Sequence, residues 1–227
     1  MITPKQIKIA VILLFGLFSA LSAPAKDNKR MYGIWYLPSG VNTVNGLTLT
    51  CLGCFDNGRC VSNGIRLELP GFGFLLPLAA SPRVDSEADY ADLVSTPADK
   101  VITGLNISLT GTVTEGDIRG ISIGGLDQQS IRAYGIFAAL LANNAVDLMG
   151  IQLAVFDNNA GRVRGLQLGI VQNRSLSLQG LQVGAYNACT RGKGGLQIGL
   201  INRRGTTGCQ IGLLNINQSR IMPLFNW

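Results

Sequence analysis

The sequence contains no histidine, the residue on which most acid–base and nucleophilic catalysis depends. A zinc site at Cys51-x-x-Cys54 would need further ligands, and imidazole is not available to supply one. Charged residues make up only 14% of the chain, and no Gly-Lys-Ser or Gly-Lys-Thr triplet follows a predicted strand. The sequence therefore predicts no enzyme, no metal site and no bound cofactor.

A long apolar run occurs at the N-terminus. Lys5 and Lys8 precede the run from Ile9 to Leu21, and Ser22-Ala23-Pro24-Ala25 follows it. A basic start, a short apolar run and small residues are typical of a secretory signal peptide, and the run is short for a transmembrane helix. We expect an exported protein of the cell surface, outer membrane or periplasm that loses residues 1–25, with an uncleaved anchor as the alternative.

Export changes how the five cysteines are interpreted. Cys51, Cys54 and Cys60 cluster, whereas Cys189 and Cys209 lie far downstream. Disulfides are the default for clustered cysteines in an oxidising compartment, and an odd count leaves at least one thiol unpaired within the chain. We predict a disulfide among Cys51, Cys54 and Cys60, with plain thiols as the alternative.

A unit of about 15 residues repeats along the chain. Its first residue is glycine at Gly104, Gly120, Gly135, Gly150, Gly165, Gly180, Gly195 and Gly208, and two irregular copies start at Gly46 and Gly64. A fixed step is the mark of a stacked architecture. We divide the chain into a signal peptide (1–25), an N-terminal region with the cysteine cluster, two irregular repeats and an acidic insert (26–103), and an eight-repeat β domain (104–227).

Aligned units share a pattern of period two. The second and fourth positions are apolar throughout, and the third is often glutamine: Gln152, Gln167, Gln182, Gln197 and Gln210. Such alternation predicts a strand with one buried face, so we expect the apolar columns inside and the glutamines outside. The fifth position is small and the next two are mostly apolar, which predicts a bend or corner there.

These features predict an all-β fold, a repeat β-solenoid of about 15-residue coils. Fifteen residues at about 3.3 Å make a path of about 50 Å, and equivalent residues then stack about 4.8 Å apart, where glutamines can pair their amides. An eight-stranded outer-membrane β-barrel is the alternative, supported by the aromatic ending PLFNW. Neighbouring units match each other better than alternate units do, which favours the solenoid.

The units GLQLGIVQN, GLQVGAYN, GLQIGLIN and CQIGLLN, together with PLFNW, resemble the GLQIGLIN-type repeats of uncharacterised surface repeat-containing proteins of Gram-negative bacteria. The likeness is strong over residues 150–227 and weaker over 46–149, where Phe137 replaces the usual glutamine. The resemblance implies export and surface exposure. It implies no reaction and no catalytic residues.

Charge is distributed unevenly. Acids concentrate around 85–92, whereas residues 158–227 contain none and carry eight cations. On stacked coils, a basic edge is expected from the cations that fall late in their units: Arg162, Arg164, Arg174, Arg191, Lys193, Arg203 and Arg204. This edge would suit an anionic glycan, lipid head groups or another envelope protein, and we expect no nucleic-acid partner. Alternatively, these cations only keep exposed turns soluble.

The sequence is compatible with two functions. The first is a non-enzymatic exported surface or cell-envelope β-repeat protein, a structural or binding scaffold. The second is an integral outer-membrane barrel, structural or pore-like. Asp127 and Asp157 share one column two units apart, near the spacing of an inverting carboxylate pair, but the column suits corner residues better.

Export predicts a processed N-terminus. The mature protein recovered from the cell envelope should begin near Pro24 or Lys26, because the small residues at 22–25 provide the cleavage site. Intact-mass measurement checks this. An envelope protein that still begins at Met1 would contradict it.

Overall fold

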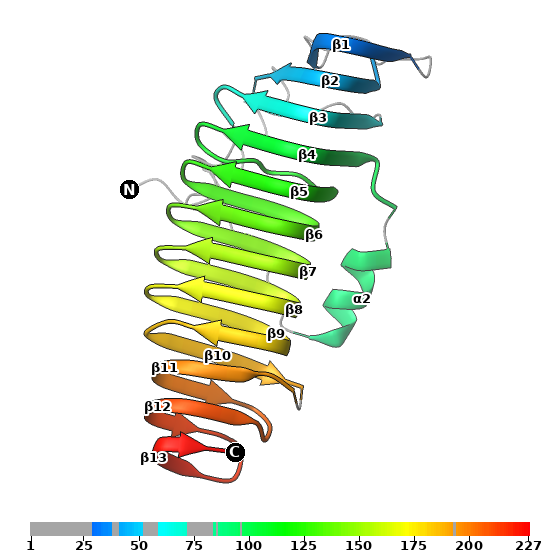
Figure 1. The fold of residues 1–227 in the computed structure, drawn as a ribbon. Helices are drawn as coiled ribbons and strands as arrows, with labels where there is room; N and C mark the ends of the chain where they lie inside the picture. Colours follow the sequence, from blue (N-terminus) through cyan, green and yellow to red (C-terminus); the bar gives the residue numbers. More distant parts are fainter. Residues whose placement is uncertain are drawn as a thin grey trace, which may run out of the picture.

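The computed structural model describes residues 29–37, 41–51, 59–71, 84, 86–95, 97–192 and 194–227. They form a β-solenoid of about 11 coils (Figure 1). Thirteen strands of the described chain make one sheet in which each strand neighbours the next in sequence. The predicted solenoid of about 15-residue coils is confirmed, and the chain does not form the alternative antiparallel barrel.

The strands follow one another with short connections over most of the chain. Their bounds are β1 (Arg30–Leu37), β2 (Thr43–Thr50), β3 (Cys60–Glu68), β4 (Lys100–Ser108), β5 (Asp117–Gly124), β6 (Asp127–Ala139), β7 (Ala142–Ala154), β8 (Asp157–Gly169), β9 (Gln172–Val183), β10 (Tyr186–Arg191), β11 (Leu196–Arg204), β12 (Cys209–Ile216) and β13 (Ile221–Asn226). The helix α2 (Glu87–Ser95) lies between β3 and β4. The sheet therefore begins within residues 26–103 and continues without interruption into the eight-repeat region.

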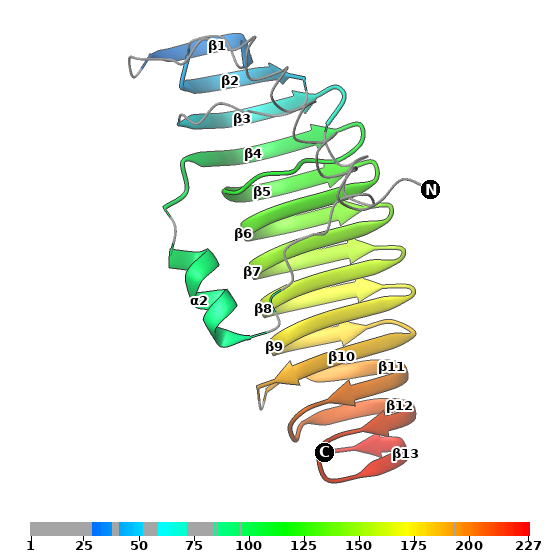
Figure 2. The ribbon, with the colours of Figure 1, turned by 180° about the vertical axis from the view of Figure 1, so that it is seen from behind.

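Strand pairing shows how the coils stack. Gly150 pairs with Gly135 and Gly165, and the pairing is parallel, so each coil repeats its neighbour's path 15 residues later. In the described chain, only β13 pairs antiparallel, against β12. Each coil has two arms: the glycine arm runs from the repeat glycine to the fifth position, and the return arm runs from the following corner to the next glycine. Figures 1 and 2 show the stack from opposite sides.

A steric constraint explains why each repeat begins with glycine. Gly165 has φ 144°, a conformation that only glycine adopts readily. A Cβ atom placed there would lie 2.0 Å from the carbonyl oxygen of Gly150 on the preceding coil. Each coil therefore needs glycine at this position to let its neighbour approach.

The glutamine column lies inside the coils, so the prediction that it faces outward is wrong. Gln167, Gln182 and Gln197 are 0% exposed. Each side-chain amide donates to the glutamine of the preceding coil, at 2.9 Å from Gln167 to Gln152, 2.7 Å from Gln182 to Gln167 and 2.8 Å from Gln197 to Gln182. Stacking satisfies both donor and acceptor, which removes most of the cost of burying an amide.

A second ladder of asparagines fills the inner side of the corner. Asn158 Nδ2 donates to Asn173 Oδ1 at 2.9 Å and to the carbonyl oxygen of Leu168 at 2.8 Å, so it ties the two arms together. The small fifth residue makes this contact feasible, because a Cβ on Gly169 would lie 3.1 Å from Asn158 Nδ2 and 2.8 Å from Asn173 Oδ1. The full set of the ladder's asparagines is Asn143, Asn158, Asn173, Asn187, Asn202 and Asn215.

This ladder revises one alignment made from the sequence. Asp127 and Asp157 do share a column, through Ala142 between them. Asn187, by contrast, pairs with Asn173 and points inward, because its corner is one residue shorter than the corner after Gly165. The aspartates are thus one position removed from the asparagine ladder.

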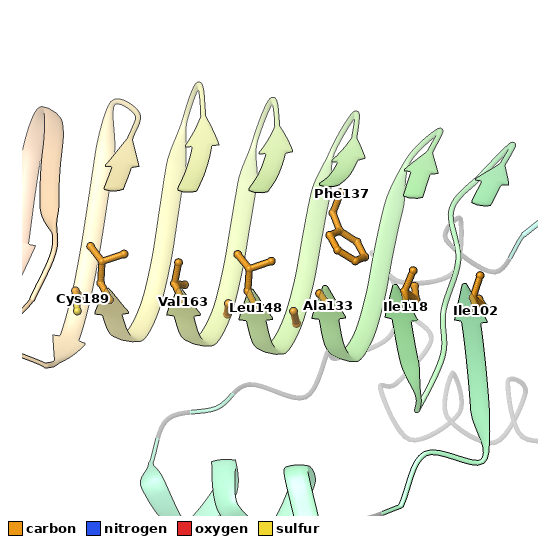
Figure 3. Packing of buried hydrophobic residues seen from close by; sticks show 10 residues of the cluster. Ile102, Ile118, Ala133, Phe137, Leu148, Val163 and Cys189 are labelled. Atoms are coloured by element: carbon orange, nitrogen blue, oxygen red, sulfur yellow. The ribbon is translucent and has the colours of Figure 1, made fainter. Parts of the chain in front are cut away.

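The apolar core lines the inner side of the return arm. Ile118, Ala133, Leu148, Val163 and Leu178 occupy one column and are at most 1% exposed. Figure 3 shows labelled members of this core on successive coils, with Phe137 reaching toward them from the glycine arm. Phe137 takes a glutamine position and extends the core across the coil. From β7 onward, the interior therefore combines an apolar column on the return arm with amide ladders on the glycine arm and at the corner.

The acidic insert contributes a helix that packs on the outside. Tyr90 of α2 is buried against Ile131, Val146 and Leu176. Arg162 lies over the Tyr90 ring, 4.0 Å from its centroid, and pairs with Glu87 at 2.6 Å. Figure 1 shows α2 along one edge of the stack and the arrowheads of β2 to β9 along the other.

The buried ladder predicts the order of two matched substitutions. Gln182→Leu should lower the free energy of unfolding by about 2–4 kcal/mol, because it leaves Gln167 Oε1 buried without a donor and leaves Gln197 Nε2 with only the 3.4 Å contact to the carbonyl oxygen of Arg203. The reverse exchange, Leu181→Gln, changes an outward residue and should cost less than about 1 kcal/mol. Urea unfolding measures both. The opposite order would place the glutamines on the outer surface.

Candidate binding surface

The outer surface of the glycine arm is apolar along the whole stack. The second and fourth positions point outward, on the opposite side of the strand from the buried glutamines. Ile121 is 43% exposed, Ile123 44% and Ile136 38%. We call this surface the apolar face, and its central and late members are Ile121, Ile123, Ile136, Ala138, Ile151, Leu153, Leu166, Leu168, Leu181, Val183, Leu196, Ile198 and Ile211. The prediction that these columns form the core is wrong.

The apolar surface continues around the corner at the sixth and seventh positions. Leu140, Phe156, Ile170, Leu200 and Leu213 are between 52% and 70% exposed. We call this set the apolar corner. The predicted bend is confirmed at Leu140, Phe156 and Ile170, which lie between consecutive strands, whereas Leu200 and Leu213 lie within β11 and β12. Face and corner together form one apolar surface that spans two sides of the coil.

A shallow groove of about 590 Å³ lies where the face meets the corner near the C-terminal end. The fifth-position glycines form its floor, because they carry no side chain between the fourth and sixth columns. Its lining residues are Val183, Gly184, Ala185, Ile198, Gly199, Leu200, Ile211, Gly212, Leu213 and Leu224. The groove carries no charged group.

The return arm presents a polar outer surface. Gln129, Asn144, Asn159 and Arg174 form one of its columns, and Arg203 lies further along the same column beyond Ala188. Arg162 and Arg191 share a second column, with Ser177 between them. The coil is thus amphipathic, with an apolar glycine arm and a polar return arm.

The predicted basic residues do not form a single row. Arg162, Arg164 and Arg174 are paired with acids, at 2.6 Å to Glu87, 3.0 Å to Asp147 and 2.5 Å to Asp157. Arg204 is 2% exposed, and its guanidinium donates to the carbonyl oxygens of Gly192, Gly194 and Gly195. These four arginines hold neighbouring segments together.

Two of the predicted cations are exposed and make no ion pair within the described part of the chain: Arg191 and Arg203. Arg203 and Arg204 also line a cavity of about 410 Å³ between the last coils, together with Tyr186 and Asn217. Lys193 lies outside the described residues. Positive charge without a partner therefore gathers toward the C-terminal end.

The cysteine cluster is divided. Cys60 is disulfide-bonded, whereas Cys51, Cys189 and Cys209 carry free thiols. Cys54 lies outside the described residues. Cys51 is therefore not part of a disulfide here, and Cys209 is exposed at a second position of the apolar face.

Asp127 is a buried acid at the start of β6. It is 6% exposed, and its Oδ1 has no hydrogen-bond partner. Burial raises the pKa of its carboxyl to about 6; a hydrogen bond from the Ala142 backbone partly offsets this, and Asp157 in the same column adds to it. Asp157 itself is paired with Arg174. The two carboxylates thus have different surroundings, and neither lines the groove or the cavity described above.

Over the ranges that the structure describes, no group of three or more cysteine, aspartate or glutamate side chains is arranged to hold a metal ion. No helix in those ranges has both the length and the hydrophobicity to cross a bilayer. Comparison with protein-family models, curated proteins and solved structures finds no match to this chain. The function is therefore inferred from the arrangement of residues on the surface.

The raised pKa of Asp127 predicts a pH-dependent stability. The folded protein holds this proton to a higher pH than the unfolded chain, so stability should fall as pH rises from about 4 to about 6. Asp127→Asn removes that fall and should be more stable at neutral pH by about 1–2 kcal/mol.

Thermal unfolding across this pH range measures the effect. Asp157→Asn is the matched control in the same column, and it should lose stability at neutral pH because it breaks the pair with Arg174. Equal pH profiles for wild type and Asp127→Asn would contradict the assignment.

Proposed function

We propose that the protein is an exported, non-enzymatic scaffold of the cell envelope that binds through its apolar face and apolar corner. One observation carries the proposal: the second and fourth columns point outward in register over successive coils. Soluble proteins rarely leave a contiguous apolar surface of this extent uncovered, and such surfaces mark sites of interaction.

The interior supports a structural role. The glutamine and asparagine ladders link every coil from β7 to β12 with side-chain hydrogen bonds in addition to the strand pairing. Such repeated bonds keep the outward columns aligned. A rigid, regular surface suits a scaffold that presents the same chemistry along its length.

Export is supported by the order of residues 1–25, with lysines, a short apolar run and small residues. The disulfide at Cys60 suits an oxidising compartment. The absence of histidine from the sequence and the pairing of Asp157 with Arg174 favour a non-enzymatic role.

Removal of one coil tests the scaffold. Deletion of residues 165–179 joins Arg164 to Gly180 and places Gly180 over Gly150, so both ladders close again with one layer fewer. The variant should keep the wild-type circular dichroism and protease resistance per residue, and it should reach the same cell fraction as the wild type.

Deletion of residues 165–171 is the control. Seven residues are less than one coil, so the residues that follow no longer pair with their equivalents and inward side chains turn outward; this variant should unfold or aggregate. Collapse of both variants to the same degree would show that the coils are not interchangeable. Recovery of wild type in the cytoplasm alone would contradict export.

A further inference from the structure

We infer that the apolar face and apolar corner lie against an anionic lipid surface. This inference rests on the proposed function and names its partner. Among the described residues, no segment covers the apolar face, since α2 packs on Ile131, Val146 and Leu176 at the other edge of the stack. Within the described part of the chain, the apolar face is therefore open to a partner.

The area of the surface is large for a free protein. The glycine arm presents about four residues, or about 13 Å, and coils stack at about 4.8 Å. About 11 coils then give an apolar face of about 700 Å², before the corner is added. Typical largest patches on monomers are about 300–600 Å².

The shape of the surface favours a fluid partner. The face and the corner lie on two sides of the coil, and Ile170, Leu200 and Leu213 at the corner are 55% to 70% exposed. A flat protein surface docked on the face would leave the corner in water. Acyl chains can cover both sides at once, because lipid adapts to the shape that enters it.

The groove provides a binding site for an apolar chain. It holds about 590 Å³ and follows the glycines at 184, 199 and 212 across three coils. Leu200, Leu213 and Leu224 are among the residues that line it. A groove of this composition suits a hydrocarbon chain and offers no charge to a polar ligand.

The charges fit an anionic surface. Residues 158–227 contain no acid and eight cations, of which Arg191 and Arg203 are exposed on the return arm without ion pairs in the described chain. Opposed strand layers lie about 10 Å apart, and an interfacial element sinks its apolar side about 5–10 Å into the lipid. The return arm then sits at the level of the head groups, within about one Debye length.

The C-terminal end carries aromatic side chains typical of a membrane interface. Phe225 and Trp227 stack with ring centroids 5.6 Å apart and are 47% and 54% exposed. Arg220 lies 4.6 Å from the Trp227 ring. Aromatic rings beside a cation are favoured where acyl chains meet head groups.

Vesicle flotation tests the inference. The protein as purified from the envelope should float with phosphatidylcholine vesicles that contain phosphatidylglycerol, and poorly with phosphatidylcholine alone. Leu200→Ser combined with Leu213→Ser should lower the partition coefficient about tenfold or more, because both side chains would leave the lipid. Met149→Ser combined with Asn159→Ser, which changes outward residues off the face and corner, should leave it unchanged.

A separate set of variants tests whether positive charge contributes to vesicle binding. Arg191→Gln and Arg203→Gln should each lower binding to the anionic vesicles about fivefold, and neither should alter binding to neutral ones. Added salt should weaken wild-type binding to anionic vesicles.

Insertion is read from an environment-sensitive fluorophore on the exposed thiol of Cys209, in a Cys51→Ser background. Its emission should shift to the blue with anionic vesicles. The same dye on Asn159→Cys, with Cys51→Ser and Cys209→Ser, should shift much less, because that position is on the return arm, at the level of the head groups and outside the acyl chains. Unfolding curves confirm that each variant is folded.

Three outcomes overturn the inference: no flotation, flotation that the two leucine substitutions do not weaken, or a dimer in solution that those substitutions dissociate while vesicles stay unbound. The last result would assign the face to a second copy of the chain. The proposed function fails separately, since a protein that binds vesicles but is found only in the cytoplasm is not exported. If the protein is exported but does not bind vesicles, the lipid inference is wrong and the proposed function still stands.

Discussion

The rest of the structure depends on stacked amide hydrogen bonds inside the coils. A glutamine or asparagine buried alone would be costly, because its amide would lose water without finding a partner. Here each amide finds the equivalent amide of the next coil, as Gln182 does at 2.7 Å from Gln167. The interior can therefore be polar, and the apolar residues of the same strand become available for the outer surface.

This arrangement links the backbone to the surface. Gly165 allows close approach of two coils, Gly169 makes room for Asn158 and Asn173, and the resulting ladder holds the corner in a fixed shape. A fixed corner aligns the outward residues of the glycine arm over many layers. The same constraints that define the coil thus define the proposed binding surface and its groove.

The pairing of charged side chains changes along the stack. In the middle coils, acids such as Asp147 and Asp157 pair with arginines of neighbouring coils, and Glu87 of α2 pairs with Arg162. The last coils have no acids, so Arg191 and Arg203 remain exposed while Arg204 is used to hold backbone carbonyls. Position in the stack, rather than position in the repeat, decides whether a cation is structural or available to a partner.

The sequence by itself determined the repeat, the parallel stacking, the glutamine ladder and the corner, because each depends on spacing along the chain. It did not determine which side of the strand faces inward. Alternation of Leu181, Gln182 and Val183 is compatible with either facing, and the usual preference for buried apolar residues pointed the wrong way. Only the stacked structure decided this, since the amides are satisfied by neighbouring coils that no single unit contains. The uses of Arg162 and Arg204 likewise required the tertiary structure, because their partners lie in other elements.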